Sequence, residues 1–218
     1  MEIRTEAYGV HSVFRRLCKE EQGHCINVAK YMETILRALL KTRKYSMERE
    51  LKFDRLREIF LYHDIGKAYV PEVILHKAGK LTNEENRIMQ KHTEYGRQIL
   101  EDEKYLIGEA DERYYSAAMD IAGYHHEWWD GSGYPRGLEG KQIPLLARIC
   151  AVADVYDALL SDRSYKKAVP ALLVRKRLQD MSGIHFDPEI VKVFIDGCDI
   201  ENEDKQEGPE RAGVGIDR

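Results

Sequence analysis

Apolar residues recur every three or four positions over most of the chain, which is the period of a helix with one buried face. This period predicts helices over the following segments: residues 12–43, 51–62, 82–100, 113–125 and 145–160, with further helices after Pro170 and Pro188. The alternation of period two that is typical of half-buried strands is scarce. We therefore expect an all-α fold, built as a single helical domain over residues 1–198.

Local signals mark where these helices begin and end. Thr82 followed by Glu85 predicts a capping box at the start of one helix. The segment 130–135 contains two glycines and a proline and cannot continue a helix, so it is expected to be a loop. Residues 70–81 are also expected to form a loop. Residues 101–112 are expected to be an acidic surface insertion, and residues 199–218 a flexible acidic tail.

Composition narrows the class of protein. The 218 residues are 43% hydrophobic and 33% charged, which is ordinary for a soluble globular protein. No apolar run approaches the ~20 residues needed to span a bilayer, and the acidic amino terminus does not resemble a signal peptide. A cytoplasmic protein without a membrane partner is expected. The net charge of −4 excludes broad electrostatic attraction to DNA, and the four cysteines are expected to be reduced thiols.

Polar residues of the metal-ligand type interrupt the apolar faces. They are Glu20, His24, His63, Asp64, His92, His125, His126 and Asp154. Each one alone is more simply explained as a hydrogen-bonded core residue. Together they would be a costly set of buried polar groups unless a cation binds them. Imidazole and carboxylate ligands without thiolates favour iron or manganese, and eight donors exceed the needs of one ion, so two or three divalent ions are expected.

Two sequence spacings support this cluster. His63 and Asp64 follow the apolar line of residues 51–62 and arrive together at the inner end of that helix. Neighbouring residues diverge by about 100° around a helix, which suits a group of ions better than one tetrahedral cage. Glu20 and His24 lie four residues apart, on one side of their helix.

The motifs that carry these residues resemble those of the HD-GYP family, a branch of the HD superfamily of metal-dependent phosphohydrolases. The similarity runs from about Glu20 to Phe194. It includes HDIGK at 63–67, VPEVILHKAGKLTNEE at 70–85, KHTEYG at 91–96, HHEWWDGSGYP at 125–135, IPLLARICAVADVYDALLSDRSYKKA at 143–168 and FDPEIV at 186–191. An HD dipeptide alone has little specificity, whereas HHE followed by DGxGYP at this distance is highly specific.

The resemblance implies a helical phosphodiesterase that hydrolyses cyclic di-GMP to linear pGpG or GMP. It assigns the metal ligands to His63, Asp64, His92, His125, His126 and Asp154, with Glu20 and His24 completing a third metal position. It implies that Lys67 stabilises charge on the phosphate, and that Arg163 and Lys166 bind phosphate. Gly133 and Tyr134 are expected to shape the substrate pocket. A hydroxide that bridges two cations, formed because the metals lower the pKa of water toward ~7, would be the nucleophile.

Two alternatives remain open at this point. One is a hydrolase of another cyclic dinucleotide such as cyclic GMP-AMP, and the other is a sensor that binds such a nucleotide without cutting it. Sensors usually lose ligands, which this sequence retains. No receiver or sensor domain fits before Glu20, so we do not expect an attached sensor. A homodimer is compatible with the sequence, which does not fix the oligomeric state.

Overall fold

The computed structural model describes residues 9–42, 44–45, 52–107, 112–161 and 168–197, and these residues are predominantly helical. The elements are α1 (Val10–Phe14), α2 (Lys19–Lys41), α3 (Phe53–Phe60), η2 (Ile65–Tyr69), α4 (Glu72–Leu75), α5 (Asn83–Gln90), α6 (His92–Ile107), α7 (Glu112–Tyr124), η4 (Gly140–Gln142), α8 (Leu145–Leu160), α9 (Ala171–Asp180) and α10 (Pro188–Gly197). Over the described ranges there is no strand, only two isolated β-bridges. The expected all-α fold is confirmed.

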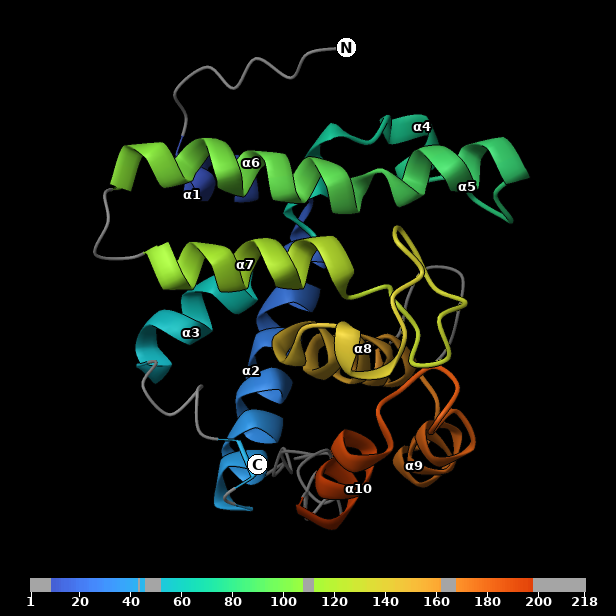
Figure 1. Ribbon diagram of the computed structural model, residues 1–218. Helices are drawn as coiled ribbons and strands as arrows, with labels where there is room; N and C mark the ends of the chain where they lie inside the picture. The colour runs from blue at the N-terminus through green and yellow to red at the C-terminus, as the bar shows by residue number, and fades with distance from the viewer. Residues whose placement is uncertain (1–8, 43, 46–51, 108–111, 162–167, 198–218) are drawn as a thin grey trace, which may run out of the picture.

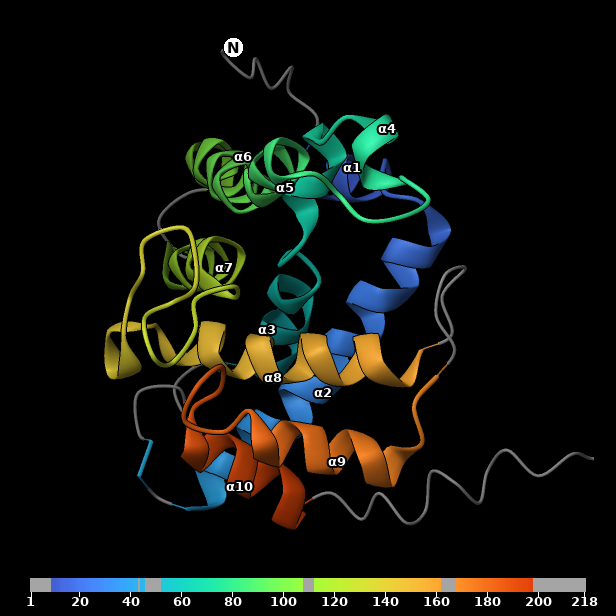
Figure 2. The same cartoon turned by 90° about the vertical axis from the view of Figure 1, so that its right-hand side faces the viewer.

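The helices are organised around an antiparallel pair and a pair of crossing helices. Figure 1 shows α6 and α7 as an antiparallel pair on one side of the molecule. Figure 2 shows α8 crossing α2 in the middle, with α9 and α10 on the side of α8 away from α6. The short η2 segment packs against α6. This arrangement brings the amino-terminal half of α2, η2, the start of α6 and the end of α8 toward one another.

The buried faces follow the apolar periods of the sequence. Along α2, Val28, Met32 and Ile35 are fully buried, as spacings of three and four residues require for one face. Helix α8 is apolar over most of its circumference because α2, α7, α9 and α10 all pack against it. Fully burying each such aliphatic side chain contributes about 1.5–3 kcal/mol. A continuous core therefore holds the helices that carry the polar cluster.

Several predicted boundaries are confirmed. Helix α8 begins and ends where the sequence predicts, and α9 and α10 follow Pro170 and Pro188. Thr82 and Glu85 form the predicted capping box: the amide of Glu85 donates to Oγ1 of Thr82, and the amide of Thr82 donates to the Glu85 carboxylate. Cys18, Cys25 and Cys150 are free thiols, as expected.

Other boundaries were wrong. The helix predicted over residues 12–43 is broken at residues 15–18, where the side-chain amide of Gln22 donates a 2.6 Å hydrogen bond to the carbonyl of Leu17. The expected loop at 70–81 contains the single-turn α4. The expected insertion at 101–112 is helical through Ile107 because α6 continues beyond its predicted end. The predicted tail, residues 199–218, lies outside the described residues.

Candidate metal centre

The His63–Asp64 pair lies in a turn that connects α3 to η2. The sequence predicts His63 as the next residue of the α3 helix, but α3 ends at Phe60 and the chain tightens into 3₁₀ geometry from Ile65. Both side chains are buried, with Asp64 3% exposed and His63 inaccessible. The turn lets two adjacent residues face the same interior, which a continuous helix would not allow.

Gly66 sets the distance between this turn and α6. A Cβ atom at Gly66 would overlap the backbone of His92 and of Gly96, so only glycine permits η2 to approach α6 so closely. This approach places His92, the first residue of α6, beside Asp64. The Nε2 atom of His92 lies 3.4 Å from Oδ1 of Asp64.

Asp64 stands between two groups of imidazoles and presents one oxygen to each. Its Oδ1 atom faces Nε2 of His92 and Nε2 of His125, the latter at 3.7 Å. Its Oδ2 atom faces Nε2 of His63 at 3.3 Å and Nε2 of His24 at 3.9 Å. A carboxylate with one oxygen toward each of two ligand groups is the geometry of a bridging ligand.

The ligand-type atoms form two groups, within each of which they lie no more than 4.8 Å apart. One group is Asp64, His92, His125 and His126; the other is His24, His63 and Asp154. The sequence separates these residues by up to 130 positions, and α2, α6, α8 and two turns bring them together. Seven of the eight ligands expected from the sequence therefore meet at one place.

The histidine rings are oriented by the backbone. Nδ1 of His92 pairs with the carbonyl of Met89 at 2.7 Å, and Nδ1 of His125 pairs with that of Ile121 at 3.0 Å. Such hydrogen bonds fix the tautomer in which Nε2 carries a lone pair toward the cluster. Among the residues that the structure describes, the Nε2 atoms of His63, His92 and His125 are buried without hydrogen-bond partners. These three buried nitrogens face the carboxylate of Asp64. Buried nitrogens without hydrogen-bond partners beside a carboxylate are the donor set that a divalent cation requires.

His24 is held by a carboxylate that sequence reasoning missed. Its Nδ1 atom lies 2.6 Å from Oδ2 of Asp157, and its Nε2 atom lies 2.9 Å from Oδ1 of Asp154. Asp157 is 2% exposed, one helical turn beyond Asp154 on α8. The signal in the sequence is a second carboxylate at i+3 in an otherwise apolar helix, which is costly to bury without a partner.

Burial and the neighbouring charges set the protonation of the cluster. Burial lowers the pKa of His92 to about 4 and that of His126 well below its usual value, so both imidazoles are neutral at pH 7. Burial alone would raise the pKa of Asp64, but Lys67 and His63 hold it well below its usual range. These neutral imidazoles and the ionised Asp64 are the forms that bind metal ions. Burial lowers the pKa of His24, but the carboxylates of Asp154 and Asp157 outweigh burial and raise this pKa to about 9, so His24 must lose a proton when an ion binds.

The residues therefore fit divalent metal ions, and they fit more than one. The donor set contains only imidazole and carboxylate, and it divides into two groups, with Asp64 in one of them and its Oδ2 atom facing His63 and His24 of the other. His63, Asp64 and Asp154 would belong to one position together with His24. His92, His125 and His126 would complete the other around Asp64.

The loop after α7 carries Tyr134 over this cluster. The Tyr134 ring stacks on His126 with ring centroids 4.8 Å apart, and the Tyr134 amide donates to the His126 carbonyl. Glu127, 2% exposed, accepts hydrogen bonds from the backbone amides of Arg136 at 2.7 Å and Leu138 at 3.0 Å. Sequence reasoning assigned no role to Glu127, which anchors this loop directly after His125 and His126.

Gly133 makes the fold of this loop possible. A Cβ atom at Gly133 would overlap the backbone between His126 and Trp128. The expectation that Gly133 and Tyr134 line a pocket holds for Tyr134, which lines the cavity described next. Gly133 lies behind it, against the His126 segment.

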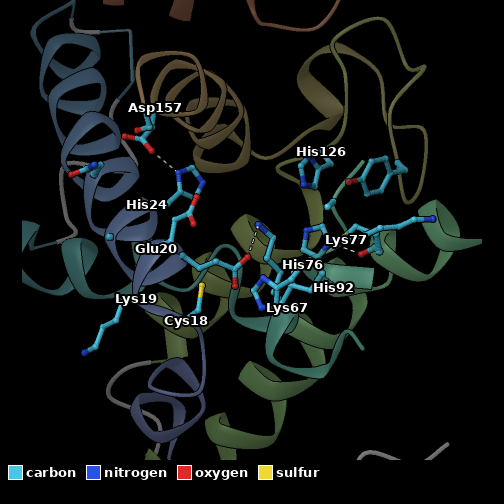
Figure 3. Close-up of a pocket in the computed structure, with 18 residues that line it drawn as sticks. Cys18, Lys19, Glu20, His24, Lys67, His76, Lys77, His92, His126 and Asp157 are labelled. Atoms are coloured by element: carbon cyan, nitrogen blue, oxygen red, sulfur yellow. Dashed lines mark hydrogen bonds and ion pairs between the residues drawn. The ribbon is translucent and has the colours of Figure 1, made fainter. Parts of the chain in front are cut away.

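A cavity of about 730 Å³ opens beside the two ligand groups. Figure 3 shows His24 and Glu20 entering it from α2, and His92 and His126 from the opposite side. Lys67 points into it between these two sides, with Nζ 2.7 Å from Oδ2 of Asp64. The cavity is large enough for a ligand of drug-like size, since such sites measure about 300–1,000 Å³.

The remaining site predictions have different outcomes. Glu20 is exposed and lines the cavity on the side of His24, but it does not belong to either ligand group. Arg163 and Lys166 lie outside the described residues. The sequence also favours surface or loop positions for His76 and His185, and this is confirmed, because His76 is exposed after α4 and His185 lies in the turn between α9 and α10. His76 lines the cavity, and His185 stacks between Trp128 and Phe186.

A family model described as the HD domain matches residues 12–190, which is most of the chain. The chain belongs to the HD domain family. In this HD domain the adjacent histidine and aspartate are His63 and Asp64, the pair at the centre of the cluster. The fold is similar to that of an HDG"Y"P protein of Bdellovibrio bacteriovorus, Bd1817. That match has a TM-score of 0.56 at 20% identity, and it covers 81% of this chain and 51% of the other.

Two curated relatives come from Vibrio cholerae. A protein named 3'3'-cGAMP-specific phosphodiesterase 2 is 38% identical over 192 residues, which is 88% of this chain and 34% of the relative. A protein named cyclic di-GMP phosphodiesterase is 37% identical over 177 residues, which is 81% of this chain and 36% of the relative. The chain thus spans about a third of the length of these relatives. Among the described residues, no helix has both the length and the apolar character that crossing a membrane requires.

Proposed function

We propose that this chain is a metal-dependent phosphodiesterase that hydrolyses cyclic di-GMP to linear pGpG or GMP. The observation that carries the proposal is the position of Asp64, whose two oxygens face two separate groups of imidazoles beside a cavity of about 730 Å³. Two cations a few ångströms apart are suited to phosphodiester cleavage because they stabilise both the attacking and the leaving oxygen. The names of the curated relatives support the choice of a cyclic dinucleotide as substrate.

The bound ions would be iron or manganese, two or three in number. Ligands without thiolates favour these metals over a structural zinc ion. Glu20 lines the same cavity as His24 and lies four residues before it on α2. We infer that a third ion, if bound, would lie between Glu20 and His24. Bound divalent ions would supply Lewis-acid activation of water, which lowers its pKa from 15.7 toward ~7.

The chain's own residues bind and orient the phosphate. The Lys67 ammonium reaches the cavity beside Asp64, where it can donate hydrogen bonds to phosphoryl oxygens and offset the charge that develops on them. Tyr134, stacked on His126, lines the same cavity. We propose that Arg163 and Lys166 bind the second phosphate, since they follow α8 directly and Arg suits bidentate contact with phosphate.

The test is anaerobic purification, reconstitution with iron or manganese, and identification of the products from a panel of cyclic dinucleotides. Asp64→Ala is expected to remove hydrolysis and to lower the amount of bound metal, because both ligand groups lose their shared carboxylate. Asp54→Ala, which removes an exposed carboxylate on α3, serves as the matched control and is expected to keep both. Wild-type turnover in the Asp64 variant would refute the proposal.

The same panel decides between two related functions. Preferential cleavage of cyclic GMP-AMP would assign this chain the activity named for its Vibrio cholerae relative. Tight binding of a cyclic dinucleotide by the metal-loaded protein without any product would identify a sensor. The retention of seven clustered ligands favours the enzyme, since a sensor does not need them.

A further inference from the structure

Lys67 stands between two carboxylates. Its Nζ atom lies 2.7 Å from Oδ2 of Asp64 and 3.5 Å from Oε1 of Glu21, and its side chain is 18% exposed. Figure 3 shows the lysine inside the cavity with a dashed ion pair toward the α2 side. Glu21 is the neighbour of Glu20, but the sequence pattern predicts no role for Glu21.

The two neighbouring glutamates differ in environment. Glu20 is exposed, whereas the Glu21 side chain is 15% exposed and lines the inner wall of the cavity. The Oε2 atom of Glu21 is buried and has no hydrogen-bond partner among the described residues. Burying a carboxylate is costly unless a positive charge offsets the cost, and Lys67 supplies a positive charge beside Glu21.

The contact with Glu21 becomes more important when the ligand groups bind ions. The oxygens of Asp64 face the imidazoles at 3.3–3.9 Å, so divalent cations in those groups would share its negative charge. The same cations would repel the Lys67 ammonium, because like charges a few ångströms apart interact strongly in a site of low dielectric. A carboxylate on the far side of the lysine offsets this repulsion.

We propose that Glu21 is a positioning residue that holds the Lys67 ammonium in the cavity, where Lys67 contacts the phosphate of the substrate. This inference rests on the proposed function, because the contact matters for turnover only if Lys67 acts on a phosphodiester. In this proposal Glu21 acts by contacting Lys67 and does not itself contact a metal ion or the substrate. Its carboxylate, not its size, is the property that matters.

Glu21→Gln tests the charge at nearly constant volume. We expect kcat to fall about tenfold, equivalent to about 1.4 kcal/mol, with a smaller change in KM and with metal content and melting temperature as in the wild type. Glu84→Gln is the control, because Glu84 is an exposed glutamate paired with Arg87 on α5 and lies outside the cavity. Loss of a metal ion from Glu21→Gln would make Glu21 a ligand and overturn the inference.

A double-mutant cycle separates action through Lys67 from a general structural effect. In a Lys67→Gln background, Glu21→Gln is expected to lower kcat by less than about twofold, because the group that it positions is gone. A full tenfold loss in that background would show that Glu21 acts independently of Lys67. An unchanged kcat in the single variant would also refute the inference.

A measurement without substrate tests the contact even if the chain hydrolyses no cyclic dinucleotide. Acetylation of the metal-loaded protein, followed by mass spectrometry, reports how well each lysine amine is held. We expect Lys67 to react several-fold faster in Glu21→Gln than in the wild type, and Lys19 on the cavity rim to react at the same rate in both. Equal rates at Lys67 would refute the contact, whereas absent turnover in the wild type would refute only the proposed function.

Discussion

At the scale of single residues, hydrogen bonds to the imidazoles decide which ring nitrogen faces the cluster. Oδ2 of Asp157 accepts a hydrogen bond from Nδ1 of His24 at 2.6 Å. The backbone carbonyls of Met89 and Ile121 accept the corresponding hydrogen bonds from Nδ1 of His92 and of His125. A histidine that gives its Nδ1 proton to an acceptor keeps the lone pair of Nε2 for a cation. Asp157 is the one charged acceptor of these three, so it also makes His24 a more basic ligand.

We predict that Asp157→Asn weakens metal binding at the His24 group. Loss of the charged acceptor should reduce affinity about 10–100-fold, the usual effect of removing a residue that orients a ligating histidine. Titration of the metal-free protein with manganese measures this directly. Asp180→Asn, an exposed position on α9, is the control and should bind like the wild type. Equal affinities in the two variants would contradict the role of Asp157.

At the scale of elements, the site depends on how closely η2 approaches α6. In the polar cluster, Oδ1 of Asp64 lies 3.4 Å from Nε2 of His92, although Asp64 directly precedes η2 and His92 begins α6. Gly66 allows this approach because its missing side chain leaves room for the backbone of His92. Gly23 in α2 is a contrasting glycine, since a Cβ atom there would meet nothing within 4 Å.

The two glycines give opposite predictions for stability. Gly66→Ala should lower the free energy of unfolding by about 3 kcal/mol, because backbone atoms of α6 must move to admit the methyl group. Gly23→Ala should raise it by about 0.5–1 kcal/mol, because alanine costs less entropy than glycine inside a helix. Urea unfolding of the metal-free proteins measures both. A Gly66→Ala variant as stable as the wild type would mean that η2 and α6 do not pack as described.

At the scale of the whole molecule, the candidate metal centre joins α2 and α8 to the unit formed by η2 and α6. Helices α2 and α8 carry His24 and Asp154, while the η2–α6 unit carries His92. Without ions, this interior holds ionised Asp64 and Asp154 among several unsatisfied imidazole nitrogens. Ions that bind these groups in the folded state alone shift the folding equilibrium toward it.

Removal of metal should therefore destabilise the chain. At a free ion concentration of 100 times Kd, binding contributes about 2.7 kcal/mol, which corresponds to about 5–11 °C in melting temperature for a protein of this size. Thermal unfolding before and after treatment with a chelator tests the shift, and returning manganese should reverse it. The Asp64→Ala variant should show little response to either treatment. A chelator effect of equal size in that variant would place the stabilising ion elsewhere.

The amino-acid sequence by itself determined which residues lie on buried helix faces and which side chains are of the ligand type. Burial along α2 and α8 follows from local spacing, and the capping box at Thr82 involves residues three positions apart. Such features depend on neighbours in the chain, so a periodic pattern predicts them. The residue types and their positions on buried faces also identified seven of the ligand-type residues that meet in the structure, including His63 and Asp154.

The tertiary structure alone decided which atoms face one another. It placed Glu21 rather than Glu20 beside Lys67, paired Asp157 with His24 across 133 positions, and ended α3 before His63. A helical period assigns a residue to a face but does not fix the rotation of its side chain or its distance from a residue on another helix. Those quantities depend on how α2, η2, α6 and α8 pack together, and that packing also determines how the ligands share Asp64.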